Sequence, residues 1–544
     1  MRSTRTAVLV LLVPLVPFAV MLALGLWGLD RGTMWRDESA TFQVARRSLP
    51  EIADLITSVD AVHGLYYVLM HFVLAPFPSE VALRLPSVLG AAGTAALVAA
   101  TGARLARPRV GLWAGLAYAV TPFVGHYAQE GRSYALVACA AALATLLLPY
   151  AAERGGTRRW AAYAAVAACA ALLHMFALLL LAAHAATLLL SRVERRVWRG
   201  WAAAAGAVCV VLAPLVVMSR GQSGQVGWLA KPDAVAAGQL VLAFTGPRTL
   251  VTVTLALTAL ALLRPLPGKA PGRLPLAAVA LPLVLVPPVL LLAVSQWEPL
   301  YFDRYVLFSL AGVPLLAAAG AERLVHDTVG ALRAAGMLGR GSAAECAGRS
   351  AAEPVAAPRP RPRRWPRSPG LSRSVTALVG AVAVAVAFWW QLSDHERLRL
   401  TISRADDFAA IARTADRAMG PGEPVLYLPG FSRRTALGYP RRFEDARDVA
   451  LREPAARSGT LYGTEFDGAE LRRRLACLDR VWVLITSQAT RGAWQPDDPS
   501  DRAKLAVLRE EFTRRETHRS GDALLALYVR MTPAPGPGPR PYAG

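Results

Sequence analysis

Two adjacent acidic residues, Asp37 and Glu38, lie in a short polar segment that directly follows an apolar run over residues 7–29. A carboxylate beside a hydroxyl group can act as a general base and remove its proton while the oxygen attacks another atom. The alternative is a solvated pair of loop charges without a chemical role. A divalent metal ion near the two acids is a further option, although nothing in the sequence demands one.

An arginine, Arg304, lies in the cluster WEPLYFDRY over residues 297–305, at the start of another long apolar stretch. Its planar guanidinium group offers paired donors and stays charged, so it is suited to hold a phosphate. Neutralising a departing phosphate would stabilise a transition state in which negative charge develops. The alternative is that Arg304 only extends to the lipid headgroups at the helix end.

A third cluster, HYAQEGRSY over residues 126–134, joins two apolar runs. Gln129, Glu130 and Arg132 bring an amide, a carboxylate and a guanidinium together at this junction. Several groups that ionise or hydrogen-bond are costly at a membrane boundary unless they are solvated or have a function. We therefore treat these three residues as candidates for a site.

A fourth cluster, HGLYY, contains His63, Tyr66 and Tyr67. A histidine next to two tyrosines at a membrane boundary can belong to the aromatic belt at the lipid–water interface. It can equally line a polar pocket. The residues alone do not separate these two interpretations.

The elements that carry these clusters are those of a membrane protein. Of the 544 residues, 54% are hydrophobic, and apolar runs of roughly 17 or more residues recur, which is the length of a membrane-spanning helix. The first run is longer than the apolar core of a signal peptide, so we expect an uncleaved helix. The predicted spans are 7–29, 82–105, 110–127, 132–152, 159–174, 175–190, 201–219, 236–263, 274–296, 303–323 and 375–392.

We therefore expect an all-α polytopic membrane protein with about 11 to 12 transmembrane helices. The apolar stretch 64–77 is short, and it is either an additional span or a segment packed partway into the membrane. The net charge of +22 does not point to nucleic acid, because much of the arginine lies in short loops between apolar runs. There is no Cys-X-X-Cys motif or Cys/His cluster, so a structural zinc site or disulfide framework is not expected.

Arginine-rich loops predict the orientation, since such loops stay on the cytoplasmic side. They occupy residues 103–109, 153–159, 192–199, 264–273 and 327–374. The remaining connections then lie outside: 30–63, 128–131, 220–235, 297–302 and everything after residue 392. This places the N-terminus in the cytoplasm, the C-terminal domain outside and all four clusters on the outer face. The expected location is the plasma (inner) membrane, with many crossings.

The last part of the chain is organised differently. Residues 327–374 contain the run PRPRPRRWPRSPG, whose density of Pro and Arg cannot bury a core and predicts a disordered cytoplasmic linker. Short apolar strands at 425–428, 481–486 and 524–529 alternate with amphipathic helices at 406–419 and 467–476, which predicts a small α/β domain. The predicted domain map is a core at 1–326, the linker 327–374, a last transmembrane helix at 375–392, the extracytoplasmic α/β domain at 393–533 and a disordered tail at 534–544.

Taken in order, these motifs resemble those of the C-type membrane glycosyltransferases. The resemblance is to the family that includes protein O-mannosyltransferases and the aminoarabinose transferase of lipid A, and it covers roughly residues 1–325. It rests on the acidic pair and on four motifs: HGLYYVLMH (63–71), ALRLPSVLG (82–90), YAQEGRSYAL (127–136) and DRYVLFSLAGVPLLAAAG (303–320). Gly64 stands where the family often has proline, which changes the local shape of the loop end.

The resemblance implies an inverting glycosyltransferase that takes a sugar, mannose-like or other, from a polyprenyl-phosphate donor at the outer face. Its acceptor would be a glycan, a lipid or a protein, and membrane lipids surround it. Asp37 matches the position of the catalytic base, and Arg304 matches a basic position that meets the donor phosphate. The candidate donor-binding residues are Arg304, Arg132, Gln129, Glu130, His63, Tyr66 and Tyr67.

Two other functions compete with this one. A transporter or flippase of a lipid-linked substrate would place charged or broken helices at mid-membrane, often in repeated halves, whereas the charged clusters here gather at one predicted face. A membrane scaffold that only presents the C-terminal domain would leave the outer-face acids and Arg304 unexplained. Neither the sugar nor the acceptor follows from the sequence.

Overall fold

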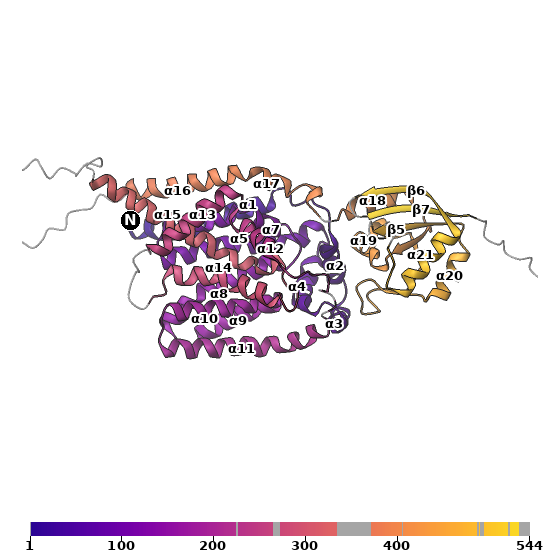
Figure 1. The fold of residues 1–544 in the computed structure, drawn as a ribbon, viewed down its shortest axis with the longest axis horizontal. Coiled ribbons are helices and arrows are strands. Elements are labelled where there is room, and N and C mark those ends of the chain that lie inside the picture. The colour runs from indigo at the N-terminus through magenta and orange to yellow at the C-terminus, as the bar shows by residue number, and fades with distance from the viewer. Residues whose placement is uncertain are drawn as a thin grey trace, which may run out of the picture.

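The computed structural model describes residues 2–222, 224, 227–264, 273–334, 371–404, 406–486, 489, 494–520 and 523–531. Long helices lie side by side in one body, and a smaller α/β region adjoins one end of it (Figure 1). The N-terminus lies at the opposite end of the helical body. The architecture is thus the predicted one, a helical membrane protein with a small C-terminal α/β region.

Helices of 7 to 26 residues form the body. They are α1 (Arg2–Leu26), α5 (Glu80–Leu105), α6 (Pro108–Ala119), α7 (Pro122–Ala128), α8 (Tyr134–Arg154), α9 (Thr157–Leu173), α10 (Leu179–Leu190), α11 (Arg195–Arg220), α12 (Ala234–Thr245), α13 (Arg248–Leu263), α14 (Leu276–Val294), α15 (Gly312–Ala334) and α16 (Leu371–Trp390). Among the described residues, five single helices, or six with one bent pair, have the length and hydropathy to cross a membrane, and shorter apolar helices accompany them. All eleven predicted spans coincide with helical segments.

Small side chains let the central helices approach one another closely. Helix α5 packs against α1, α6 and α8, and its sequence is rich in alanine and glycine. A Cβ atom on Gly111 of α6 would collide with the carbonyl oxygen of Ala99 in α5. Close packing of this kind is the main attraction between helices in lipid, where there is no hydrophobic drive for them to associate.

Two predicted spans are broken. The predicted helix 236–263 is a pair, α12 and α13, bent by 80°, because Gly246 adopts a left-handed backbone and Pro247 follows it. The predicted helix 110–127 divides into α6 and α7 just before Pro122, which opens α7. In both places a proline cannot continue the hydrogen bonding of the preceding helix.

The apolar stretch 64–77 does not form a long helix. It contains α4 (Gly64–Leu74), which has 11 residues and is therefore about 16 Å long. The apolar core of a bilayer is about 30 Å thick, so α4 cannot span it alone. It lies next to α2 (Arg36–Ala45) and α3 (Leu49–Ser58), at the end of the body that faces the α/β region (Figure 1).

The C-terminal region is built on a mixed sheet of five strands in the order β2-β1-β5-β7-β6. Strand β1 (Pro424–Leu428) runs parallel to β2 (Arg447–Asp448) and β5 (Arg480–Thr486), while β7 (Ala523–Arg530) is antiparallel to β5 and β6 (Phe512–Ser520). A separate ribbon joins β3 (Leu451–Glu453) to β4 (Thr464–Glu465). The helices of this region are α18 (Phe408–Ala418), α19 (Arg434–Gly438), α20 (Gly468–Ala476) and α21 (Pro499–Glu511), whereas α17 (Leu392–Arg397) follows α16 along the helical body (Figure 1).

The three predicted strands and two predicted helices of this region are all present, as β1, β5, β7, α18 and α20. Strand β6 was not predicted, because its sequence FTRRETHRS is almost entirely polar and most of it is exposed at the sheet edge. Helices also extend into the predicted linker, since α15 ends at Ala334 and α16 begins at Leu371. The rest of the linker, 335–370, and the predicted tail, 534–544, lie outside the described residues.

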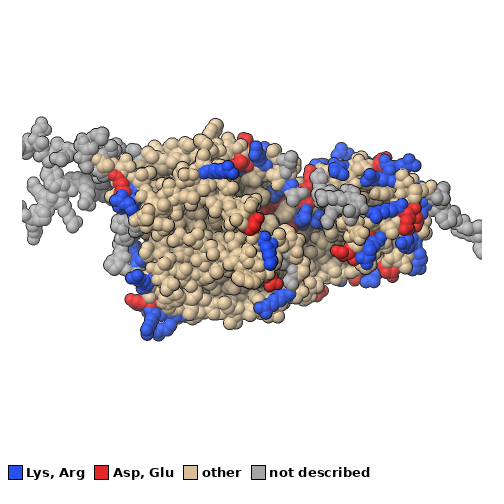
Figure 2. All heavy atoms as spheres, viewed as in Figure 1, with Lys and Arg blue, Asp and Glu red and all other residues tan. Residues whose placement is uncertain are grey.

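Charged side chains follow the same plan. On the face shown in Figure 2, the long side of the helical body is nearly free of charge, and Lys, Arg, Asp and Glu gather at its ends and over the α/β region. An uncharged belt between charged ends is what a bilayer requires, because a charge in its apolar core is costly.

Candidate functional site

Helix α2 presents the first acid of the predicted pair to the site. Asp37 lies in its first turn, where a carboxylate interacts favourably with the helix dipole. The carboxylate oxygen Oδ2 of Asp37 lies 3.4 Å from a guanidinium nitrogen of Arg304. The two residues are 267 positions apart in the chain, so the fold brings together the two groups that the sequence singled out.

Arg304 lies in an aromatic enclosure at the start of the 3-10 helix η4 (Asp303–Ala311). Its guanidinium carbon is 4.3 Å from the ring centre of Phe302, and further rings lie 5.4–5.8 Å away, those of Trp35, Tyr134 and Tyr305. The side chain of Arg304 is only 10% exposed, and its Nε atom is buried without a hydrogen-bond partner. A buried guanidinium with a free donor and one weak ionic contact is suited to receive an anion.

Glu38 faces elsewhere, because adjacent residues of a helix point about 100° apart. Its two carboxylate oxygens accept hydrogen bonds from Nε and Nη2 of Arg84 at 2.8 and 2.9 Å, and the Gly131 amide donates at 2.8 Å. Burial alone would raise the pKa of the Glu38 carboxyl, but the guanidinium groups of Arg84 and Arg404 outweigh it and hold this pKa below its usual value. Glu38 is thus an ionised residue in a closed ion pair.

Arg84 joins three elements through this pair. Besides Glu38, it donates hydrogen bonds to the carbonyl oxygens of Leu29 and Thr33 at 3.1 and 3.0 Å. Through Arg84, helix α5 therefore binds both the segment between α1 and α2 and the buried face of α2. Sequence analysis quoted Arg84 within the motif 82–90 but assigned it no role, since a single arginine in an apolar run carries no signal of its partner.

Arg132 and His63 form a buried chain of polar groups beside α2. Arg132 donates to Nε2 of His63 at 2.5 Å and to Oγ1 of Thr41 at 3.2 Å. The other ring nitrogen of His63 lies 2.9 Å from Asp60, whose second oxygen accepts a hydrogen bond from Tyr67. Burial would raise the pKa of the Asp60 carboxyl, but His63 and Arg132 lower it well below its usual range. Asp60 was not singled out from the sequence.

Two further predicted residues, Gln129 and Tyr66, do not reach Asp37 or Arg304. Gln129 donates from its amide to the carbonyl oxygens of Gly25 and Trp27 at 2.9 and 2.8 Å, which fastens the outer end of α1. Tyr66 is fully buried in the apolar core. Among the described interactions, neither side chain contacts Arg304 or Asp37.

Glu130 stands apart from the other loop residues. It is 1% exposed, and its Oε1 atom is buried without a hydrogen-bond partner. Its other oxygen lies 3.8 Å from Nε2 of His126. Burial raises the pKa of the Glu130 carboxyl to about 7, although Arg304 lowers it in part. A carboxyl group with this pKa can exchange a proton near neutral pH.

Sequence analysis also missed His174, which lies where α9 ends within the apolar stretch 159–190. Its ring is 4.7 Å from that of Tyr305 and 6.4 Å from that of His63. It therefore joins the aromatic enclosure to the buried polar chain. A lone polar residue between two predicted spans was the only signal that could have identified it.

The two acids do not fit a shared divalent metal ion. Glu38 is committed to Arg84 through both oxygens, and the nearest charged partner of Asp37 is the cation Arg304. Across the described residues, no group of three or more His, Cys, Asp or Glu side chains is placed to hold a metal. The option of a metal ion between Asp37 and Glu38 therefore has no geometric support.

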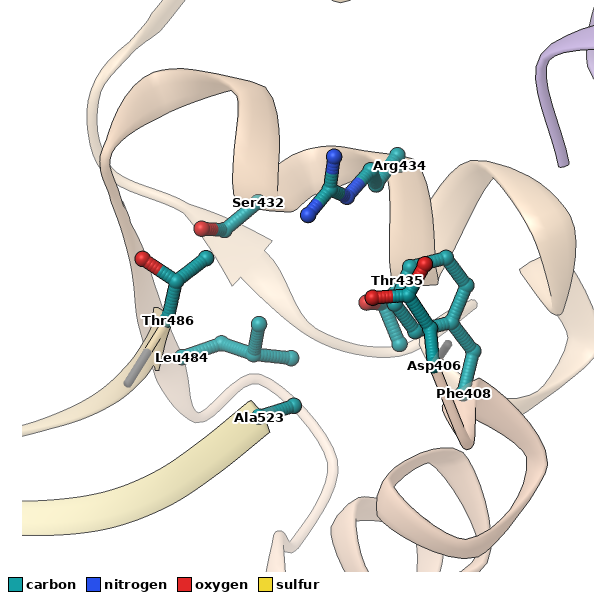
Figure 3. A pocket seen from close by; sticks show the side chains of 8 residues that line it. All are labelled: Asp406, Phe408, Ser432, Arg434, Thr435, Leu484, Thr486 and Ala523. Carbon is teal, nitrogen blue, oxygen red and sulfur yellow. The ribbon is translucent and has the colours of Figure 1, made fainter. Parts of the chain in front are cut away.

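A separate hollow lies in the α/β region (Figure 3). Its lining residues are Asp406, Phe408, Ser432, Arg434, Thr435, Leu484, Thr486 and Ala523. The cavity volume is about 10 Å³, which is the space that a single water molecule needs, so this hollow is too small for a lipid-linked sugar. It is distinct from the Asp37–Arg304 contact.

Comparison with known proteins places this arrangement in context. Residues 64–219 match the family model described as dolichyl-phosphate-mannose-protein mannosyltransferase. No curated protein sequence matches the chain significantly. The matched segment includes α4, α5 and the loop that carries Glu130 and Arg132.

The solved structures that resemble most of the chain include two of the protein ArnT. The apo structure of ArnT from Cupriavidus metallidurans has a TM-score of 0.56 at 14% identity, and the match covers 97% of this chain and 98% of ArnT. The structure of the same protein bound to undecaprenyl phosphate has a TM-score of 0.57 at 14% identity, covering 94% and 97%. At this identity the likeness establishes the fold, including the C-terminal region.

Proposed function

We propose that this chain, whose fold is that of the C-type (GT-C) membrane glycosyltransferases, moves a sugar from a polyprenyl-phosphate donor to an acceptor hydroxyl. The contact between Asp37 and Arg304 carries the proposal, because it pairs a base with a phosphate-binding group at one end of the membrane body. The family match over residues 64–219 and the undecaprenyl phosphate bound to ArnT support the donor class.

Arg304 would bind the donor phosphate. Donor binding replaces its contact with Asp37 by a stronger one to the phosphate oxygens, and the unpartnered Nε supplies a second donor. The rings around Arg304 exclude water, and charge–charge interactions are stronger where water is excluded. The guanidinium group then stabilises the negative charge that develops on the phosphate as the bond to the sugar breaks.

Asp37, released from Arg304, would act as the general base. The acceptor oxygen attacks the anomeric carbon and loses its proton to the carboxylate, while the bond between that carbon and the phosphate oxygen breaks. The bonding electrons leave with the polyprenyl phosphate. A single displacement of this kind inverts the anomeric centre. Glu38, which sequence analysis grouped with Asp37 as catalytic, serves instead to position α2 through Arg84.

The outer face of the plasma membrane is the proposed location of the reaction. Arginine-rich connections such as 103–109 and 153–159 lie at the end of the body opposite α2 and the α/β region. The positive-inside rule assigns that end to the cytoplasm. The four predicted polar clusters then share the extracytoplasmic side.

Two measurements test the proposal. Purified protein in detergent should bind undecaprenyl phosphate, and the R304A variant should bind it more weakly by about one to two powers of ten, the value of a charge-assisted hydrogen bond. Mass spectrometry of envelope glycans, lipids and glycoproteins with and without the gene should reveal one missing sugar. Unchanged envelope composition together with no binding of undecaprenyl phosphate would refute the function.

A further inference from the structure

Helix α2 lacks a cap of its own. It has ten residues, and Trp35 at its N-cap position makes no side-chain hydrogen bond to the first turn. The first amide groups of any helix have no partner within the helix and usually receive one from a Ser, Thr, Asp or Asn side chain at the N-cap. A helix this short is also marginal without outside support.

The missing cap comes from the other end of the chain. Oδ2 of Asp406 accepts a hydrogen bond from the backbone amide of Arg36, the first residue of α2, at 3.0 Å. The same carboxylate holds the Arg36 side chain through two further bonds, at 3.1 and 3.2 Å. Asp406 is 370 residues away in sequence, and its side chain is 2% exposed. Figure 3 shows Asp406 beside the hollow of the α/β region, opposite Arg434.

Further hydrogen bonds from the α/β region run along one face of α2. Oγ of Ser39 donates to the carbonyl oxygen of Arg434 at 2.6 Å, and the amide of Gln43 donates to that of Leu461 at 2.9 Å. Positions 36, 39 and 43 are three and four residues apart, so they share a single helical face. The α/β region therefore contacts one face of α2, while Asp37 on the neighbouring face reaches Arg304.

We infer that the C-terminal α/β region is a positioning element of the active site and that Asp406 caps, from a distance in sequence, the helix that presents the catalytic base. The inference deepens the proposed function and rests on it. Asp406 does not touch the reacting atoms, so it is a positioning residue. Its loss should allow the first turn of α2 to fray and move Asp37 from its place, without changing the groups that bind the donor phosphate.

Three variants of the full-length protein test the inference by activity. D406A should lower kcat by about 2- to 30-fold, the range expected for loss of a helix cap, while the KM for the donor stays unchanged. D406N should retain most of the activity, because Asn caps helices about as well as Asp. The matched control is D416A, which removes the same group from an ion pair with Arg442 elsewhere in the α/β region, and it should behave like the wild type.

Hydrogen exchange provides a readout that does not depend on turnover. Amides 36–45 should exchange faster in D406A than in the wild type, and D406N and D416A should leave them protected. If D406A does not accumulate, Y439F serves in its place. The Tyr439 hydroxyl accepts a hydrogen bond from the Met34 amide at 3.0 Å and donates one to Glu80 at 2.7 Å. Its loss should loosen the segment just before α2, so the amides of the first turn of α2 should again exchange faster.

The outcomes separate the two proposals. Equal exchange of amides 36–45 in wild type and D406A would overturn the positioning role, whatever the activity. A different result is faster exchange in D406A while the wild-type protein neither binds undecaprenyl phosphate nor transfers sugar. That result would establish the cap and refute the glycosyltransferase function. A loss of kcat that appears equally in D416A would also overturn the inference, since it would mean general damage to the region.

Discussion

At the scale of single residues, the two neighbouring acids of α2 have different environments. Asp37 is 24% exposed and has one weak contact to Arg304, whereas Glu38 is completely buried in a bidentate pair with Arg84. A base must give up its resting partner when substrate arrives, which a 3.4 Å contact allows and a closed buried pair does not. The position of each residue around the helix therefore decides its chemistry.

Replacing Asp37 by Asn tests its role as the base. The amide keeps the size of the side chain but cannot accept the proton, so transfer should fall by about a hundredfold or more. Binding of undecaprenyl phosphate should remain near normal, because Arg304 is untouched. Transfer is compared at equal abundance in the membrane, and normal transfer by D37N would show that Asp37 is not the base.

Arg304 distinguishes phosphate binding from membrane anchoring. If it only anchors the helix end, Lys should replace it without effect, since both side chains carry a charge on a long stem. If it holds the donor phosphate, R304K should reduce transfer moderately, because the planar fork is lost. R304A should reduce it by about one to two powers of ten. Normal activity in both variants, at equal abundance in the membrane, would restore the anchoring interpretation.

Glu130 should make donor binding depend on pH. Below its pKa of about 7 the carboxyl is neutral, and above it the new negative charge faces a site that must accept a phosphate. The charged groups that surround it are Arg304, Glu38, Asp37 and Arg404. The donor KM should therefore rise as pH increases through 7, by about tenfold for coupling equal to one pKa unit. In E130Q the KM should stay constant between pH 6 and 8, and the same rise in that variant would rule Glu130 out.

At the scale of elements, the acids, Arg304 and the helices could be predicted because apolar runs and charge patterns are local. The residues that contact these groups could not be predicted. Arg84 lies within the motif 82–90 and Asp60 lies just before His63, but neither residue carries a local signal of the partner that it fixes, Glu38 for Arg84 and His63 for Asp60. Neither the break at Gly246 nor the polar edge strand β6 has the periodicity of a typical element. Contacts that depend on which helices are neighbours require the three-dimensional packing.

The pair between Glu38 and Arg84 should stabilise the whole outer end of the body. Both side chains are at most 1% exposed, and removal of one partner leaves an uncompensated buried charge, at a cost of about 3–5 kcal/mol. E38Q and R84M should each lower the melting temperature in detergent markedly. The double variant E38L/R84M should melt at a higher temperature than R84M alone, because it no longer contains the buried charge of Glu38 without its partner, while Glu80, which lies 3.3 Å from Arg84, loses Arg84 in both variants. Purely additive losses would contradict this account.

At the scale of the molecule, segments from distant parts of the sequence meet at the end of the helical body that carries the site. The loop with Glu130, the end of α1 and the α/β region meet through Arg404, which donates to the Gln129 carbonyl at 2.8 Å, and Arg399, which donates to the Trp27 carbonyl at 2.9 Å. These contacts join segments about 275 to 372 residues apart. Sequence analysis predicted that the clusters share a face, from the distribution of arginine, but it gave no role to the α/β region.

The orientation of that end is the last prediction. Arginine-rich connections at the opposite end should lie in the cytoplasm, so Asp37, Glu130, Arg304 and the α/β region should lie outside. Reporter fusions after residue 60 and after residue 400 should both give an extracytoplasmic signal, and a fusion within 153–159 should give a cytoplasmic one as the control. A polyprenyl-phosphate donor presented at the outer leaflet would then reach Arg304 directly. A cytoplasmic signal after residue 60 or 400 would place the site on the wrong side for that donor and would require the proposed reaction to occur at the inner leaflet.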